Sequence, residues 1–339
     1  MKKTLIALSV LAASGAAMAQ SSVTLYGAAD VWFGSFKAPG AVRQTAIGSG
    51  GIDDSFFGFK GSEDLGGGLR ANFVLEQGFT IDNGAGFRTT DNLGAPVNAT
   101  FGRQAYVGFS SGYGEVRVGK TFTPFDDISG ATTPAFDSAL APTSNVWAST
   151  GYNANPNNTV YYASPSLSGF SVAGSFSLGE NKSPAIKAGK LASAHIKYAN
   201  GPVYVGLAYQ AERLLPTDRR VNFTRLNGSY DLGVVKLLAG YGRVENQGNS
   251  NAETDEWQIG ADFPVSSALT LSGGYARSKD NAATVATPNA KRTGVGLAAN
   301  YSLSKRTAVY GGVQASKQKQ ANVPELKGSL YAVGVRHTF

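Results

Sequence analysis

The chain contains no cysteine, so neither disulfide bonds nor thiolate metal sites are available to it. Only two histidines occur, His195 and His337, and neither has a partner at metal-ligand spacing, so we expect no metal and no cofactor. No motif brings a nucleophile, a base and an orienting group together, and we therefore expect no enzyme. Outside the first twenty residues, no run approaches the roughly 18 apolar residues of a membrane-spanning helix. These absences leave two classes, a soluble protein and a β-barrel.

The first residues have the pattern of an export signal. Lys2 and Lys3 precede an apolar run at 5–13, and a small-x-small site ends at Ala19. This pattern predicts a cleaved signal peptide, 1–19, and a mature chain, 20–339. Without the two lysines of the leader, the mature chain has 28 basic and 23 acidic residues, a net charge of +5. The signal predicts export of the mature chain.

Glycine and aromatic residues are abundant, with 43 Gly, 15 Tyr and 18 Phe. Glycine is costly inside helices and common at turns, so this composition favours many short strands. Segments of alternating polarity, separated by turn signals, recur from end to end and predict sixteen strands. The predicted strands are 22–36, 55–63, 69–79, 99–110, 115–122, 159–164, 170–179, 193–199, 203–211, 221–230, 234–244, 253–264, 269–278, 292–302, 307–316 and 328–339.

The connections between these strands alternate in length, seven short and eight long. The long ones are 37–54, 80–98, 123–158, 180–192, 212–220, 245–252, 279–291 and 317–327. Outer-membrane barrels have short periplasmic turns and long extracellular loops, whereas a soluble sandwich has no reason to sort its connections by length. The last segment, 328–339, has one apolar face and ends on an aromatic residue, and in a barrel it would pair with the first strand. The sequence therefore predicts an all-β fold, a 16-stranded antiparallel transmembrane barrel.

Alternation also assigns a face to each side chain, apolar toward lipid and polar toward a water-filled lumen. Aromatic residues near strand ends are expected at the two membrane interfaces. The predicted interface aromatics are Tyr198, Tyr209, Tyr241, Tyr275, Tyr301 and Phe339.

Several charged residues fall in the lumen phase of their strands. The basic ones are Lys60, Arg70, Arg117 and Arg336, and the acidic ones are Glu76 and Glu115. A cationic wall in a narrow aqueous pore favours the entry of anions. Carboxylates on segment 123–158 would face this wall, and the candidates are Asp126, Asp127 and Asp137. Alternatively, the basic groups only hydrate the lumen or pair with Glu76 and Glu115.

Five stretches of the sequence are distinctive: SVTLYG at 22–27, GFKGSEDLGGGL at 58–69, FGRQAYVG at 101–108, TPFDD at 123–127, and the terminal Phe339. Together they resemble one known family, the trimeric general porins of β-proteobacterial outer membranes. The expected location is therefore the outer membrane of a Gram-negative bacterium. The resemblance implies a homotrimer and a third loop, 123–158, that folds into the lumen and constricts it. In one place the chain departs from the family, which has arginine where this sequence has Phe56. That departure weakens the transfer of a strong anion preference.

We expect passive diffusion of small hydrophilic solutes and ions, with a weak preference for anions. One alternative is a solute-specific channel in which Tyr26, Trp32 and Tyr106 stack on a sugar. Another alternative is a non-conducting barrel that acts as an adhesin. The expected partners are further copies of the chain, outer-membrane lipid and lipopolysaccharide. Despite a pI of about 9.4, the export signal and the scattered charges argue against nucleic acid.

Overall fold

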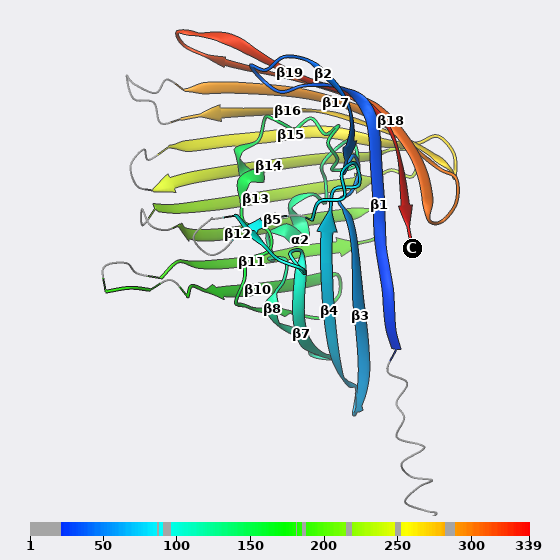
Figure 1. Ribbon diagram of the computed structural model, residues 1–339, viewed down its shortest axis with the longest axis vertical. Helices are drawn as coiled ribbons and strands as arrows, with labels where there is room; N and C mark the ends of the chain where they lie inside the picture. The colour runs from blue at the N-terminus through cyan, green and yellow to red at the C-terminus, as the bar shows by residue number, and fades with distance from the viewer. Residues whose placement is uncertain are drawn as a thin grey trace, which may run out of the picture.

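The computed structural model is a closed antiparallel β-barrel (Figure 1). It describes residues 22–86, 88–90, 96–180, 182–184, 188–214, 219–247, 252–281 and 289–339. The predicted signal peptide, 1–19, lies outside these residues. In the part of the chain that is described, no helix is long and apolar enough to cross a membrane.

The barrel wall is one antiparallel sheet, and each strand pairs with its neighbours in the chain. Its strands are β1 (Ser22–Lys37), β2 (Gln44–Ser49), β3 (Ser55–Gly66), β4 (Leu69–Phe79), β7 (Gln104–Ser111), β8 (Gly114–Lys120), β9 (Thr159–Ala163), β10 (Phe170–Leu178), β11 (Lys190–Asn200), β12 (Val203–Leu214), β13 (Arg219–Asp231), β14 (Lys236–Gln247), β15 (Glu253–Pro264), β16 (Leu269–Asp280), β17 (Ala290–Ser302), β18 (Thr307–Gln320) and β19 (Val323–Thr338). A separate two-stranded sheet pairs β5 (Arg88–Thr90) with β6 (Pro96–Asn98).

Pairing of the first and last strands closes the ring. β1 pairs with β19 from Ala28↔Thr338 to Lys37↔Ser329. The main chains of Gly27 and Phe339 exchange two further hydrogen bonds of 3.1 Å. In Figure 1, β1 (blue) and β19 (red) lie side by side near the C-terminus. Closure leaves the sheet no free edge, which is what a sheet needs in order to cross a bilayer. The prediction of a 16-stranded antiparallel barrel is confirmed.

The seventeenth strand, β2, is an addition to the predicted set. It lies in the connection 37–54, which the sequence predicts as a loop. β2 pairs with β1 from Val31↔Ser49 to Phe36↔Gln44, and β3 pairs with the preceding half of β1, from Ser22↔Ser62 to Ala28↔Phe56. β2 and β3 therefore pair with successive halves of β1 and together occupy one position in the ring. For this reason the seventeen strands of the sheet form a barrel of sixteen strand positions.

Two other boundaries differ from prediction. The connection 317–327 is almost entirely strand, because β18 runs on to Gln320 and β19 begins at Val323. Its turn places Asn322 at φ 62°, a backbone conformation that asparagine tolerates better than most residues. In the predicted strand 99–110, pairing begins only at Gln104. The alternation of inward and outward side chains therefore does not apply to the residues before Gln104.

The outer face of the barrel is apolar and the inner face is largely polar. Val23, Phe33 and Val107 are each more than half exposed, on the outside, as expected for side chains that meet lipid. By contrast, Gln210, Gln258 and Gln314 are fully buried on the inside, under the segment that follows β8.

Asp30 on β1 organises the interruption between β2 and β3. Its carboxylate accepts hydrogen bonds from the backbone N–H groups of Gly51 (3.0 Å), Ile52 (2.9 Å) and Asp53 (2.9 Å). The hydroxyl of Tyr310 on β18 donates to the same carboxylate. Asp30 is fully buried, and these donors supply the polar contacts that a buried carboxylate needs. The carboxylate thus joins β1, the segment 50–54 and β18.

We predict that Asp30→Asn destabilises the barrel. A carboxylate has two accepting oxygens, whereas the asparagine side chain has one oxygen and one donating NH₂ group. In the variant, at least one backbone N–H group of the segment 50–54 would therefore face another donor. Hydrogen bonds to a charged group contribute about 1.5–3 kcal/mol each, so the free energy of unfolding should fall by about 3 kcal/mol. Urea unfolding in detergent, followed by tryptophan fluorescence, measures this change. The control is Asp82→Asn, at an exposed loop carboxylate; equal losses in both variants would contradict the prediction.

Candidate functional site

The segment 123–158, here called the inner loop, folds into the barrel instead of extending away from it (Figure 1). It contains one helical turn, α2 (Asp126–Ser129), and one 3₁₀ turn, η1 (Ala148–Gly151). α2 contacts β12 and β13, and η1 contacts β14. Phe125 and Ile128 of the loop are fully buried against Phe223 and Val244 of the wall. The loop is therefore packed on the wall formed by β11–β18.

Inward polar side chains of this wall bind the backbone of the inner loop. The Ser193 hydroxyl accepts from the N–H of Phe125 (3.0 Å), and the Ser272 hydroxyl accepts from the N–H of Ala135 (2.7 Å). The Gln314 side-chain amide donates to the carbonyl of Ser144 (2.8 Å). An irregular backbone at membrane depth needs such partners, because no lipid group can supply them.

A buried pair of charges serves the same purpose. The Arg225 guanidinium donates to the carbonyl of Ser129 (3.0 Å) and to the hydroxyl of Ser149 (2.7 Å), and it lies 4.4 Å from the centre of the Trp147 ring. The Glu256 carboxylate accepts from the N–H groups of Ala148 and Ser149. Arg225 and Glu256 therefore hold the loop against the wall. They are charged and point inward, but the loop covers them, so they do not line the open lumen.

Wall glycines provide the space for the loop. A Cβ atom on Gly296 of β17 would lie 2.2 Å from the carbonyl oxygen of Leu140, and one on Gly294 would lie 2.1 Å from that of Pro142. Cβ atoms do not approach other atoms so closely, so any larger residue at these positions would push the loop away from the wall.

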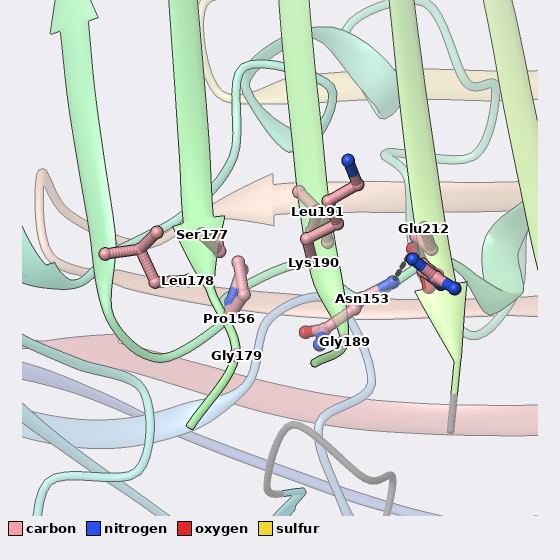
Figure 2. A pocket seen from close by; sticks show the side chains of 10 residues that line it. Asn153, Pro156, Ser177, Leu178, Gly179, Gly189, Lys190, Leu191 and Glu212 are labelled. Carbon is pink, nitrogen blue, oxygen red and sulfur yellow. Dashed lines mark hydrogen bonds between the residues drawn. The ribbon is translucent and has the colours of Figure 1, made fainter. Parts of the chain in front are cut away.

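Where the loop returns to the rim, it meets the ends of β10, β11 and β12 (Figure 2). There the N–H of Asn153 donates to the Glu212 carboxylate (2.7 Å), and the Gln210 amide donates to the carbonyl of Asn153 (2.9 Å). Pro156 and Lys190 also line the small cavity at this contact, whose volume of about 30 Å³ holds only about one or two waters. This cavity is a packing gap and has no room for a solute.

On the wall formed by β3–β8, three basic side chains lie against aromatic rings. The Lys60 ammonium is 4.4 Å from the Tyr26 ring centre, and the Arg117 guanidinium is 4.7 Å from that of Tyr161. The Arg103 guanidinium is 4.5 Å from the ring centre of Phe56, the residue that departs from the family pattern. Cations are attracted to the faces of aromatic rings, so these contacts orient the three charges.

Carboxylates accompany two of these cations. Arg117 pairs with Glu115 (2.8 Å), and Arg103 pairs with Glu76 (3.3 Å) and with Asp54. The Tyr26 hydroxyl also donates to Glu76 (2.7 Å). The charges of Arg103 and Arg117 are therefore balanced, and of these three cations only Lys60 has no carboxylate within 4 Å among the described residues.

Tyr161 of β9 connects one inner-loop carboxylate to Arg117 of this wall, and Tyr152, within the loop, holds a second carboxylate. The Tyr161 hydroxyl, whose ring lies against Arg117, donates to Asp127 (2.7 Å). The Tyr152 hydroxyl donates to Asp126 (2.6 Å). Burial and the nearby carboxylates of Asp127 and Asp137 raise the pKa of Asp126 to about 6, against the opposing effect of the tyrosine hydrogen bond. Asp126 therefore begins to lose its negative charge just below neutral pH.

Two predicted residues lie apart from this group. Arg70 is at the β3–β4 turn, where its nearest carboxylate is Asp64 at 3.9 Å, and both side chains are more than half exposed. Arg336 of β19 pairs with Asp53 of the segment 50–54 (2.9 Å). The structure thus brings Lys60, Glu76, Glu115, Arg117 and Asp127 together, and Arg70 and Arg336 belong to other parts of the barrel.

Sequence reasoning did not single out Arg103 as a site residue. Continuous alternation over 99–110 would place Arg103 on the lipid side, with Val107 and Phe109. Because strand pairing begins at Gln104, Arg103 is free to turn inward and to reach Asp54 and Glu76. Arg103 lies within the motif FGRQAYVG at 101–108, and this motif is the sequence feature that could have identified it as a site residue.

The predicted interface aromatics lie on the outer face. Tyr209, Tyr241, Tyr301 and Phe339 are exposed, and Tyr198 and Tyr275 are partly covered by the neighbouring rings of Phe170 and Trp257. Their position at the membrane interface stays a prediction. No group of three or more His, Cys, Asp or Glu residues in the described part of the chain is arranged to hold a metal ion.

Comparison with known proteins gives one result at the level of sequence and structure. The chain matches the Gram-negative porin family over residues 4–321. It is 34% identical to outer membrane porin protein 32 of Delftia acidovorans over 362 aligned positions, which cover 99% of this chain and 95% of the relative. It is 33% identical to an outer membrane porin protein of Bordetella pertussis, with 81% of this chain and 74% of the relative covered.

Solved structures agree with this match. The anion-selective porin from Comamonas acidovorans superimposes with a TM-score of 0.77 at 26% identity, over 94% of this chain and all of that one. OmpT of Vibrio cholerae, at 16% identity and a TM-score of 0.73, shares the fold over 94% of this chain and 98% of that one. The chain therefore belongs to the Gram-negative porin family and is an outer-membrane diffusion channel, not an enzyme.

Proposed function

We propose that the constriction of this channel lies between the inner loop and the wall formed by β3–β8, and that it favours small anions weakly. The observation that carries the proposal is the contact series from Arg117 through Tyr161 to Asp127, which sets a cation of the wall opposite a carboxylate of the loop. Opposed charges produce a field across the pore, and the side on which an ion travels depends on its sign.

The expected preference is weak because most charges are paired. Glu115 accompanies Arg117, and Glu76 and Asp54 accompany Arg103, so the wall offers little net positive charge. Lys60 adds one cation, which among the described residues contacts the Tyr26 ring and no carboxylate. The anion-selective porin of Comamonas acidovorans supports the sign of the proposed preference.

We propose that the channel works as a homotrimer in a membrane whose outer leaflet contains lipopolysaccharide. The support is membership of a family whose general porins are trimeric and the apolar outer face, with exposed residues such as Val23, Phe109 and Val333. A stacking site for one sugar has less support, because the tyrosines of the lumen already contact Lys60, Arg117 and a loop carboxylate. No contact among the described residues points to an adhesive surface.

Reversal of one charge tests the constriction. An ion that passes about 6 Å from a unit charge in water gains or loses roughly 0.7 kcal/mol. Arg117→Glu reverses the charge, so it should disfavour anions and favour cations by about 1.4 kcal/mol each, and the anion-to-cation permeability ratio should change by up to about a hundredfold, toward cations, at low ionic strength. The measurement is the zero-current potential of the protein in a planar bilayer under a salt gradient. Arg70→Glu, at the exposed turn, is the matched control and should change the potential much less. An unchanged potential for Arg117→Glu would remove Arg117 from the constriction.

A second prediction concerns the position of the inner loop. Gly296→Val places a side chain against the backbone of Leu140 and Pro142, while valine suits a strand. The loop stays tied to the wall by its other hydrogen bonds, so it should move toward the pore axis and lower the single-channel conductance. Gly174→Val, at a strand position with open space, should leave conductance unchanged. If both variants conduct like the unmodified protein, the inner loop does not limit the pore.

A further inference from the structure

Basic side chains form a band on the outer face of β16–β19, at the end of the barrel that bears the long connections. Odd-numbered residues of these strands face outward, as the exposed Leu271, Val295, Val313 and Val333 show. The same phase continues toward the long connections, where the apolar residues are replaced by basic ones. The members of this outer basic ladder are Arg277, Lys279, Lys291, Lys317, Lys319 and Lys327.

Strand register sets like charges directly opposite one another in the ladder. Lys279 pairs across the strands with Lys291, and Lys291 with Lys319. In the adjacent row, Lys317 pairs with Lys327. Like charges in cross-strand pairs destabilise a sheet unless something neutralises them.

The protein supplies little of that neutralisation. Glu325 lies 3.2 Å from Lys319 and 3.5 Å from Lys327, which leaves six basic residues against one acidic residue, a net charge of +5. Asp255 lies across from Lys279, but Arg243 and Tyr241 engage it. The connection 281–289 contains no acidic residue.

The height of the ladder corresponds to a membrane surface. Ten residues separate Leu269 from Lys279, Tyr301 from Lys291, and Val309 from Lys319, counted from the short-turn ends of the strands. A tilted transmembrane strand needs about 9–11 residues to cross the hydrocarbon core. The ladder therefore lies at the level of the lipid head groups of the outer leaflet.

An apolar hollow of about 610 Å³ lies below the ladder on β15–β18. Its lining includes three small residues, Gly273, Ala299 and Gly311, and the larger apolar residues Leu271 and Val313. Six residues separate Gly273 from Lys279, or about 20 Å along the strand. With a tilt of about 45°, this is a depth of about 14 Å, close to half of a hydrocarbon core about 30 Å thick.

We propose that the ladder and the hollow together bind one lipid of the outer leaflet, the phosphorylated, acylated disaccharide of lipopolysaccharide. Its phosphates would contact the ladder, because lysine ammonium groups are effective partners of phosphate. One of its acyl chains would end in the hollow. This inference deepens the proposed partnership with lipopolysaccharide and depends on the outer-membrane location, but it does not depend on ion selectivity.

The test measures binding of bisphosphorylated lipid A to the purified protein in detergent, by titration calorimetry. Neutralisation of three ladder residues, Lys291→Gln, Lys317→Gln and Lys319→Gln together, should weaken binding at least tenfold. The matched control is Lys236→Gln, Lys305→Gln and Arg306→Gln, which removes the same charge at the short-turn end and should change affinity less than twofold.

The hollow has its own test. Ala299→Trp fills it and should weaken binding of lipid A severalfold, while binding of the deacylated bisphosphorylated disaccharide should not change. Equal lipid A affinity for the unmodified protein and the ladder variant, or equal binding of dephosphorylated lipid A, would overturn the proposal. A separate measurement of conductance in bilayers of a zwitterionic lipid distinguishes channel function from lipid binding. Absence of current from the unmodified protein would refute the channel and would leave the lipid-binding result valid.

Discussion

The rest of the structure depends on one constraint, which is that each backbone N–H and C=O inside a bilayer needs a partner within the protein. Pairing of β1 with β19 meets this constraint, because it removes the last open edge of the sheet. A ring of sixteen positions is too wide for side chains to fill, so closure also creates an aqueous lumen. The period of two along each strand then separates an apolar outer face from a polar inner face.

The inner loop obeys the same constraint by a different means. It has little regular structure of its own, so inward side chains of the wall, such as Ser193, Ser272 and Gln314, pair with its backbone. Glycines such as Gly294 and Gly296 let it lie close to that wall. Because the loop covers one side of the lumen, the opposite wall, with Arg103 and Arg117, remains as its counterpart.

Charge is distributed differently on the two faces of the barrel. On the inner face, several arginines are paired with carboxylates, as in Arg117 with Glu115 and Arg336 with Asp53. On the outer face of β16–β19, lysines stand opposite lysines and outnumber the carboxylates. Repulsion within the protein is tolerable where an external anion is abundant, and the head-group layer of a membrane offers one.

The sequence by itself determined the sixteen positions of the ring and the face on which most side chains lie, because these properties follow from a local period of two, whereas β2 and the full lengths of β18 and β19 appear only in the structure. It also predicted that Lys60, Glu76, Glu115 and Arg117 share a phase. Only the tertiary structure decided which of them meet. Arg103 reaches Asp54, 49 positions away, and Tyr310 reaches Asp30, 280 positions away. Such contacts depend on ring closure and strand stagger, which alternation along a single strand does not encode.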